Sequence, residues 1–168
     1  MIKGMSLIAA VADNNIIGAN NEIPWYISED FKRFKSKTLG HAVVMGRKTY
    51  ESILKKLNKP LPGRLNLVVT NRSDYSPGNF DNAVAAGLEE ALEKAASYRP
   101  DGLFIVAGGE QIYKQTIEHA ERLFITHVCQ SPWGDAFFPT IKRDIWKETF
   151  REDHDGYSFV DYERIDGK

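Results

Sequence analysis

The fold of this chain is indicated most clearly by the stretch Ala42-Val43-Val44-Met45-Gly46-Arg47-Lys48-Thr49-Tyr50. Its first four residues are apolar and rich in valine, which is typical of a strand covered on both faces. The glycine ends that strand, and the apolar residues that follow keep the three- and four-residue spacing of one helix face: Tyr50, Ile53, Leu54 and Leu57. The stretch therefore predicts a strand over residues 42–45 and a helix over residues 48–54 whose apolar face lies in the core.

The same alternation continues on both sides of this stretch. Further strands are predicted over residues 7–12, 65–70, 103–106 and 123–129, and further helices over residues 29–36, 88–96 and 111–119. Strands that alternate with helices favour a parallel sheet covered by helices. Two mixed polar and apolar segments separated by His154-Asp155-Gly156 then form a hairpin pattern: residues 146–152 and 157–165. The sequence predicts an α/β fold, a mostly parallel twisted sheet with an antiparallel C-terminal edge and helices on both faces.

Length and composition limit the classes of function. With 168 residues the chain is long enough for one core, so we expect a single domain over residues 1–168. Lys and Arg total 22 against 23 Asp and Glu, so the net charge of -1 gives no general attraction to nucleic acid or to an anionic membrane. The apolar N-terminal segment is too short to span a membrane and lacks a signal-peptide cleavage site. We expect a cytoplasmic protein with neither nucleic acid nor membrane as a partner.

Cysteine usage indicates neither a disulfide nor a metal site. Cys129 is the single cysteine, and no cysteine and histidine residues have the spacing of a zinc site. Because it ends an apolar run, Cys129 is predicted to be a buried strand cysteine.

Asp30 is the first candidate for chemistry. Ser28 is predicted to be the N-cap of a helix, which puts Asp30 in the first turn and on one face with Phe34. With Phe31 next to it and Trp25 ahead of it, its carboxyl can lie in an apolar pocket. Burial there raises the pKa of the carboxyl and lets it hold a proton or bind a protonatable ring. The alternative is that Asp30 only complements the positive end of the helix dipole.

Two strand–glycine–helix corners predict an anion site. At Gly46 the helix begins with Arg47-Lys48-Thr49, so backbone N–H groups, the helix dipole and two cations all favour an anion. At Gly108-Gly109 another strand gives way to a helix, and the glycines let the backbone approach a pyrophosphate closely. Each corner alone could be an ordinary turn, and neither is a Walker or Rossmann loop. Two corners in one sheet suit a dinucleotide, whose anionic groups are spread along its length.

A proline-braced loop over residues 59–64 fixes Arg64 just before a predicted strand. A guanidinium held in this way suits bidentate capture of a carboxylate. The alternative is a turn glycine followed by a surface arginine.

In their order along the chain, these segments resemble the chromosomally encoded bacterial dihydrofolate reductases over nearly the whole sequence. The most specific matches are residues 17–25 followed by Asp30, residues 44–53, 60–64 and 108–113, and Thr126 followed by residues 134–139. Five matches in the family's order are hard to produce by chance. The resemblance implies an eight-stranded sheet and NADPH-dependent reduction of 7,8-dihydrofolate to tetrahydrofolate, by hydride transfer to pterin C6 and protonation of N5.

The resemblance also implies roles at the substrate. Asp30 would bind the pterin's 2-amino and N3 positions, Thr126 would support that carboxylate, and Trp25 would complete the catalytic set. Arg64 would clamp the α-carboxylate of the glutamate tail, with Lys35 as a weaker partner. The pterin and benzoyl pocket would be lined by apolar residues: Ile8, Ala10, Phe31, Phe34 and Ile53.

NADPH would be held by three groups of residues under the same resemblance. The nicotinamide would lie against Ala10 and the family's mobile loop, at Ile17, Gly18, Asn21 and Ile23, and Asp135 would hydrogen-bond that loop when it is closed. The adenosine phosphates would lie among Gly46, Arg47, Lys48, Thr49, Thr70, Asn71 and Arg72. The pyrophosphate would lie at Gly108, Gly109, Glu110, Gln111, Ile112 and Tyr113. No metal is expected, antifolate inhibitors are expected ligands, and a monomer is expected.

The chain departs from common family patterns in three places. Residues 54–58 form a longer segment after Ile53 than in many bacterial members, Gln111 replaces an arginine of some members, and Tyr26 follows Trp25. Two rival functions remain open at this point. A reductase acting on a riboflavin-pathway pyrimidine would keep the cofactor corners but has no reason to pair Asp30 with Arg64. A non-catalytic nucleotide-binding module would need neither the aspartate beside Phe34 nor a closing loop.

Overall fold

The valine-rich stretch forms β3 (Ala42–Gly46), and its alternating side chains supply two separate cores in the computed structural model, which describes residues 1–166. Val43 and Met45 pack with Tyr50 on one face of the sheet. Ala42 and Val44 pack on the other face, in a larger cluster. A strand buried on both faces needs apolar residues at every position, which explains the absence of polar alternation here.

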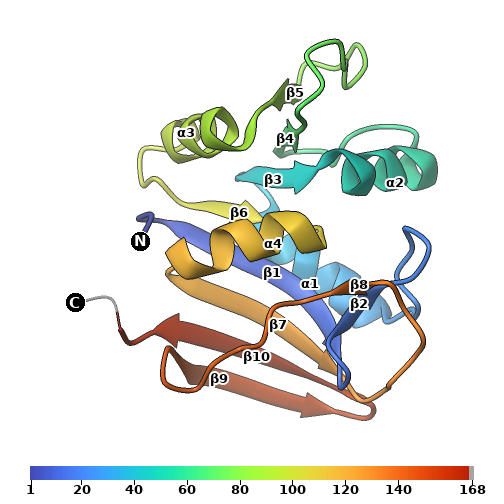
Figure 1. Cartoon of the computed structure of the whole chain (residues 1–168), viewed down its shortest axis with the longest axis vertical. Coiled ribbons are helices and arrows are strands. Elements are labelled where there is room, and N and C mark those ends of the chain that lie inside the picture. The colour runs from blue at the N-terminus through green and yellow to red at the C-terminus, as the bar shows by residue number, and fades with distance from the viewer. Residues whose placement is uncertain (167–168) are drawn as a thin grey trace.

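β3 lies within an eight-stranded sheet of order β5-β4-β3-β6-β1-β7-β10-β9 (Figure 1). Its other members are β1 (Met5–Ala12), β4 (Leu65–Val69), β5 (Ala83–Ala86), β6 (Phe104–Val106), β7 (Arg122–Val128), β9 (Trp146–His154) and β10 (Tyr157–Arg164). Neighbouring strands are parallel, except that β10 is antiparallel to both β7 and β9. The predicted mostly parallel sheet with an antiparallel C-terminal edge is confirmed.

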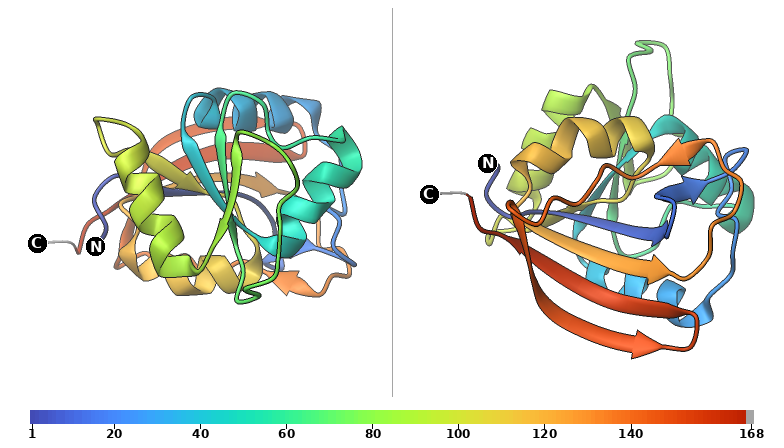
Figure 2. Two further views of the ribbon diagram at one scale, coloured as in Figure 1. Left: turned by 90° about the horizontal axis from the view of Figure 1, so that it is seen from above. Right: turned by 60° about the horizontal axis from the view of Figure 1, so that its bottom comes forward.

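Helices cover both faces of the sheet (Figure 2). They are α1 (Ser28–Thr38), α2 (Arg47–Leu57), α3 (Leu88–Tyr98) and α4 (Glu110–Thr116), the last followed by a 3-10 turn over Ile117–His119. Residues of α1 and α2 pack with the smaller core cluster, whereas residues of α3 and α4 pack with the larger one. Among residues 1–166, no helix has the length and apolarity that a membrane crossing requires.

Two short strands lie outside the main sheet. β2 (Ile16–Gly18) pairs antiparallel with β8 (Ala136–Phe137) in a two-stranded ribbon. These strands come from two segments that lie between the predicted strands and helices, residues 13–26 and 131–139, so the two segments are joined to each other.

Three predictions about single residues are wrong. Ser28 is the first residue of α1 and not its N-cap; Ile27 holds the N-cap position, and no side chain caps the helix. Cys129 is exposed, because β7 ends at Val128 and the Cys129 N–H turns to the Gly156 carbonyl at the hairpin turn. Leu57 is exposed, because it lies in the last turn of a helix that extends beyond residue 54, past the core beneath it.

Candidate functional site

Asp30 lies in the first turn of α1, facing β7. The Thr126 hydroxyl donates a hydrogen bond of 2.5 Å to its carboxylate. Burial raises the pKa of Asp30, while the hydrogen bond from Thr126 and the charge of Arg33 act in the opposite direction. The net effect is a carboxyl that takes up a proton more readily than a solvated aspartate does.

Trp25 precedes α1 and has a buried hydrogen-bond donor. Its indole Nε1 has no hydrogen-bond partner among the described residues. A buried N–H without a partner costs free energy, so this donor is available to a polar group of a ligand or to a bridging water. Trp25 thus has an unused donor in the segment that leads into α1, five residues before Asp30.

Tyr113, predicted at the pyrophosphate, lies in the core at the centre of the sheet. Its hydroxyl donates a 2.5 Å hydrogen bond to the Ile8 carbonyl on β1, and its ring packs against Phe138. Burial raises the pKa of this hydroxyl, and the charge of Asp30 raises it further. A Cβ built on Gly108 would lie 3.3 Å from the same hydroxyl oxygen, so the tyrosine links the Gly108 corner to β1, the strand beside that of Thr126.

The predicted apolar pocket residues come from three elements. Phe34 of α1 and Ile53 of α2 are partly buried and pack against the core cluster of Tyr50. On β1, Ile8 is buried and Ala10 is half-buried, and Ala10 pairs in register with Thr126. Phe31 is 43% exposed, and the Tyr26 ring packs against it at a tilt, with ring centres 5.4 Å apart. Tyr26 itself is 79% exposed, which places it at the rim and not inside the pocket.

Arg64 is buried, so the surface-arginine alternative is wrong. Its Nε donates to the Pro62 carbonyl at 2.9 Å, and one terminal nitrogen donates to the Thr38 hydroxyl at 3.0 Å. The other terminal nitrogen makes no hydrogen bond to any of residues 1–166. Burial lowers the pKa of this guanidinium, but an arginine remains charged in proteins. Lys35 is exposed one turn ahead of Thr38.

Sequence reasoning missed the residues that hold Arg64 in place. Thr38 accepts the guanidinium bond while donating to the Phe34 carbonyl at 2.7 Å. Asn66 is fully buried, and its side-chain amide bonds the backbone of Leu61 and of Arg64. An asparagine inside the apolar run of residues 65–69 was the signal that could have found it, because a buried amide needs hydrogen-bond partners.

The two glycine corners lie side by side, at the carboxyl ends of two neighbouring strands inside the sheet. β3 and β6 are neighbours, and Gly46 N donates to the Gly108 carbonyl at 2.9 Å. Neither α2 nor α4 has a side-chain cap, so their first backbone N–H groups are left to other acceptors. Gly108 has a positive φ of 117°, which strains any other residue, and a Cβ built on Gly109 would be in ordinary contact with Thr49 Oγ1 at 3.4 Å. The arrangement suits phosphate groups that bind backbone amides at close range.

The predicted phosphate-binding side chains differ in their surroundings. Arg47 is engaged by Glu51, with N–O distances of 2.9 and 3.1 Å. Lys48 and Arg72 are exposed, and neither side chain forms an ion pair within residues 1–166. The Thr70 hydroxyl accepts a 3.1 Å bond from the Arg72 N–H, while Asn71 is exposed beside it. Gln111, also exposed, lies in the first turn of α4 after Glu110.

The predicted loop contact of Asp135 is present. Asn20 N donates to both carboxylate oxygens, at 3.2 and 3.3 Å, and Asp135 N donates to the Gly18 carbonyl at 3.1 Å. Ile17 and Gly18 are half-buried, whereas Asn21 and Ile23 are exposed. The segment that follows β1 is therefore held against β8 by side-chain and backbone bonds.

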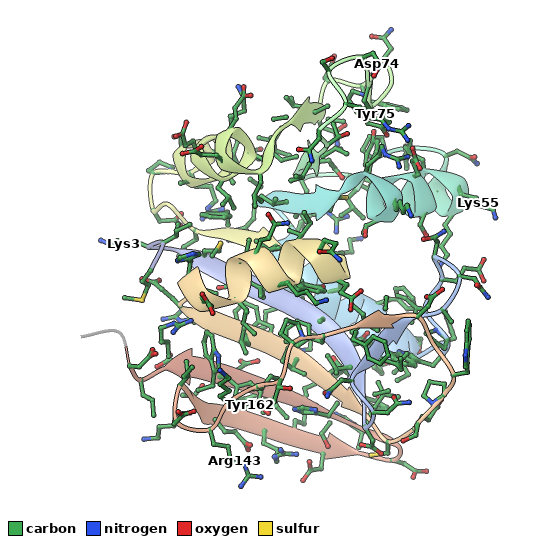
Figure 3. The ribbon with its side chains drawn as sticks, viewed as in Figure 1. Lys3, Lys55, Asp74, Tyr75, Arg143 and Tyr162 are labelled. Atoms are coloured by element: carbon green, nitrogen blue, oxygen red, sulfur yellow. The ribbon has the colours of Figure 1, made fainter. Side chains whose placement is uncertain are left out.

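Figure 3 draws the side chains of the described residues. Among residues 1–166, no group of His, Cys, Asp and Glu side chains could hold a metal ion.

Comparisons with known proteins agree on one family. The family model described as dihydrofolate reductase matches residues 4–164. A dihydrofolate reductase from Neisseria meningitidis is 45% identical over 170 residues, covering 98% of this chain and 99% of that protein. The HdrB dihydrofolate reductase from Haloferax volcanii is 43% identical over 164 residues, covering 94% and 82%. A structure of the Enterococcus faecalis dihydrofolate reductase with NADP(H) and RAB-propyl matches with a TM-score of 0.83 at 28% identity, covering 96% of each chain.

Proposed function

The chain belongs to the dihydrofolate reductase family, and from this premise we propose how its own residues carry out NADPH-dependent reduction of dihydrofolate. The observation that carries the proposal is the half-buried carboxyl of Asp30, held by Thr126 at 2.5 Å. When bound, NADPH supplies the hydride, and the protein supplies alignment, exclusion of water and polarisation. We further propose that residues 1–168 form one dihydrofolate reductase domain.

Asp30 would bind the pterin's 2-amino and N3 positions. A carboxylate that faces two such donors forms a planar pair with them, and Thr126 fixes the plane of the carboxylate. The raised pKa of Asp30 lets the Asp30–pterin pair keep a proton at higher pH than a solvated aspartate would, which supports the protonation of N5 by water. The unpartnered Trp25 Nε1 would hold a water or a polar edge of the substrate on the side of the loop.

Arg64 would hold the far end of the substrate. Two of its nitrogens are fixed by Pro62 and Thr38, so the guanidinium is oriented before a ligand binds. Preorganisation of this kind reduces the entropy lost when a carboxylate binds. Lys35 adds a solvated charge, and the intervening rings would contact Ile8, Ala10, Phe31, Phe34 and Ile53.

The glycine corners fit the anionic part of NADPH. Their close backbone packing and uncapped helix starts leave amides for phosphate oxygens. Lys48, Arg72, Thr49, Thr70 and Asn71 would surround the adenosine phosphates, Gly108 to Ile112 the pyrophosphate, and Ala10 with Ile17, Gly18, Asn21 and Ile23 the nicotinamide. Tyr113 would contribute indirectly, by holding β1 through its hydrogen bond to the Ile8 carbonyl.

We also propose that the protein works as a cytoplasmic monomer that binds antifolates at the substrate site and does not bind nucleic acid. The edge strand β9 supports a monomer, because eight of its nine residues are exposed and most of them are polar or charged. Charged edge strands disfavour pairing with another chain. The near-neutral net charge of -1 gives no attraction to nucleic acid.

The test of the mechanism is single-turnover hydride transfer against pH, with folding checked by circular dichroism. The wild-type rate should fall as pH rises through the raised pKa of Asp30. Asp30→Asn keeps the shape but needs substrate already protonated by solvent, so its rate should be very low at neutral pH and rise about tenfold per pH unit of acidification. A folded Asp30→Asn protein that retains most of the wild-type rate near neutral pH would remove Asp30 from the mechanism. Substrates of other classes, a riboflavin-pathway pyrimidine among them, serve as negative controls.

A further inference from the structure

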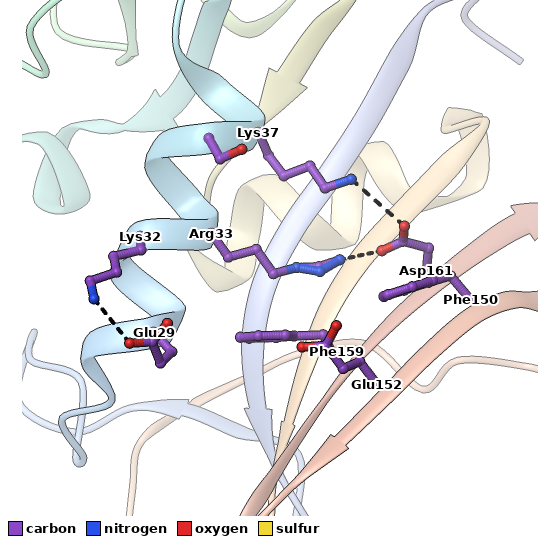
Figure 4. Close-up of a pocket in the computed structure, with 9 residues that line it drawn as sticks. Glu29, Lys32, Arg33, Lys37, Phe150, Glu152, Phe159 and Asp161 are labelled. Carbon is purple, nitrogen blue, oxygen red and sulfur yellow. Dashed lines mark hydrogen bonds and ion pairs between the residues drawn. The ribbon is translucent and has the colours of Figure 1, made fainter.

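A row of polar side chains on α1 faces the sheet. Asp30, Arg33 and Lys37 follow one another at three- and four-residue steps, so they lie on one side of the helix. Thr126 of β7 donates to Asp30, whereas Arg33 and Lys37 both reach Asp161 of β10 (Figure 4). This part of α1 therefore docks on the sheet through charged groups, where an apolar stripe is usual.

The strand register places Asp161 next to the site. Phe159 pairs with Thr126 across β10 and β7, and Asp161 lies two residues further along the same face of β10. Arg33 hydrogen-bonds Asp161, and its guanidinium carbon lies 4.8 Å from the centre of the Phe159 ring. The Arg33 guanidinium, one helix turn after Asp30, is thus held by two residues of β10, Asp161 and Phe159.

The Arg33–Asp161 pair is largely removed from solvent, with side chains 12% and 20% exposed. Charges in such surroundings are weakly screened and act over one helix turn. Burial raises the pKa of Asp30, and the Arg33 cation is one of the groups that lower it. Asp161 is the anion that neutralises this cation.

We propose that Asp161 is a positioning residue for Asp30: it fixes the Arg33 guanidinium on β10 and limits the positive potential that this cation exerts at the carboxyl. The proposal rests on the proposed function, in which Asp30 is the carboxyl that meets the substrate. The other titratable groups around Asp30 and this pair are Tyr113 from α4, Lys37, Glu29 and Lys32 of α1, and Glu152 of β9.

None of these remaining groups neutralises the charge of Arg33, so Asp161 is the main group that does. Tyr113 stays neutral, because burial raises its pKa. Glu29 is paired with Lys32 at 3.0 Å on the exposed side of α1. Lys37 shares Asp161 at 3.7 Å, so loss of Asp161 would leave two cations without their anion. A cavity of about 480 Å³ lies beside the pair, and Phe150 and Glu152 of β9 are among the residues that line it.

The experiment compares the titration of the Asp30 carboxyl, followed directly by carbon NMR, in folded variants. Arg33→Gln removes the cation and should raise the pH at which Asp30 titrates. Asp161→Asn leaves the cation without its anion and should lower that pH, and the double variant should lie between them. Glu163→Gln is the matched control, since Glu163 lies on the same strand in an ion pair with Arg122 whose side chains are 53% and 54% exposed. It should change nothing.

A merely structural role gives a different pattern. If either change only loosened α1, Asp30 would become more solvated and its titration would move to lower pH in both variants. Arg33→Lys keeps the charge and should stay near wild type, so this variant and Arg33→Gln carry the test if Asp161→Asn does not fold. Shifts in the same direction, or none beyond that of Glu163→Gln, would overturn the proposal. If the NMR titration moves as expected while the pH profile of hydride transfer does not, the proposal stands and the catalytic role of Asp30 fails.

Discussion

At the scale of single residues, the site places an acid where water solvates it poorly. Asp30 is half-buried, and desolvation is the largest influence on its pKa. The aromatic residues spaced around Asp30 predicted this burial, since a helix face and its neighbours follow from spacing alone. They did not predict that Arg33 pairs with a residue 128 positions away, because that depends on which strands the helix covers.

The raised pKa of Asp30 has a cost in stability with a definite sign. The unfolded chain loses the Asp30 proton near pH ~3.9, whereas the folded protein keeps it to higher pH. In that window the folded state binds more protons, so stability falls as pH rises, and the loss persists above the folded pKa. Asp30→Asn should therefore raise the free energy of unfolding at neutral pH and leave it nearly unchanged below pH ~3.9. Urea titrations at both pH values measure this, and equal effects at both would contradict it.

Arg64 allows a second test at this scale. Arg64→Leu should raise KM for dihydrofolate strongly and KM for NADPH little, because a bidentate charged pair is worth at least about 2 kcal/mol. Arg64→Leu also removes the hydrogen-bond partner of Thr38 and Pro62, so the thermal unfolding of the variant should be measured together with its kinetics. Lys35→Leu is the control, since Lys35 is exposed and should change KM for dihydrofolate far less. An unchanged KM for dihydrofolate in Arg64→Leu would show that Arg64 stabilises its own loop and does not bind the substrate.

At the scale of elements, the parallel strands that sequence predicted are those rich in valine, isoleucine and leucine, whereas the β9–β10 hairpin was predicted from its turn and its mixed polar and apolar segments. β5 (Ala83–Ala86) was missed because three of its four residues are alanine, a weak strand former. β2 and β8 were missed because a two- or three-residue pairing between loops leaves no periodicity to detect. Helix starts were accurate to within one residue, whereas α2 ends three residues later than predicted, at the left-handed Asn58.

The β2–β8 ribbon should govern the loop over residues 14–25. Asp135→Ala removes the acceptor of the Asn20 N–H, so hydride transfer should slow and NADPH should bind more weakly while the protein stays folded. Asp135→Asn keeps one acceptor and should lie between that variant and wild type.

Gly134→Ala tests the same ribbon by crowding, because the added Cβ would lie 2.7 Å from the Gly18 carbonyl oxygen. Single-turnover kinetics measure the rate of hydride transfer, and stopped-flow kinetics measure the binding of NADPH. Rates identical to wild type in Asp135→Ala would show that the β2–β8 ribbon does not influence hydride transfer.

At the scale of the whole molecule, the sheet brings distant segments to one anion site. Gly46 and Gly108 come from different halves of the chain, and the exposed cations Lys48 and Arg72 follow the carboxyl ends of β3 and its neighbour β4. A 2'-phosphate adds charge-assisted hydrogen bonds of about 1.5 to 3 kcal/mol each, so kcat/KM should favour NADPH over NADH by about tenfold or more.

Replacing Arg72 or Lys48 by glutamine should reduce that preference. Lys55→Gln, at the opposite end of α2, should not change it. Equal kcat/KM for the two cofactors in the wild-type protein would show that these cations do not recognise the phosphate.

The position of β1 in the sheet has a consequence for how the protein is made. β1 (Met5–Ala12) is the first strand to leave the ribosome, yet its partners β6 and β7 begin only at Phe104 and Arg122. Closing a parallel pair over such a separation is slow, because the chain entropy is lost before the contacts form. A nascent chain that ends before residue 104 therefore has a central strand with both edges unpaired. The apolar side chains of that strand must be shielded from other chains until β6 and β7 have been synthesised.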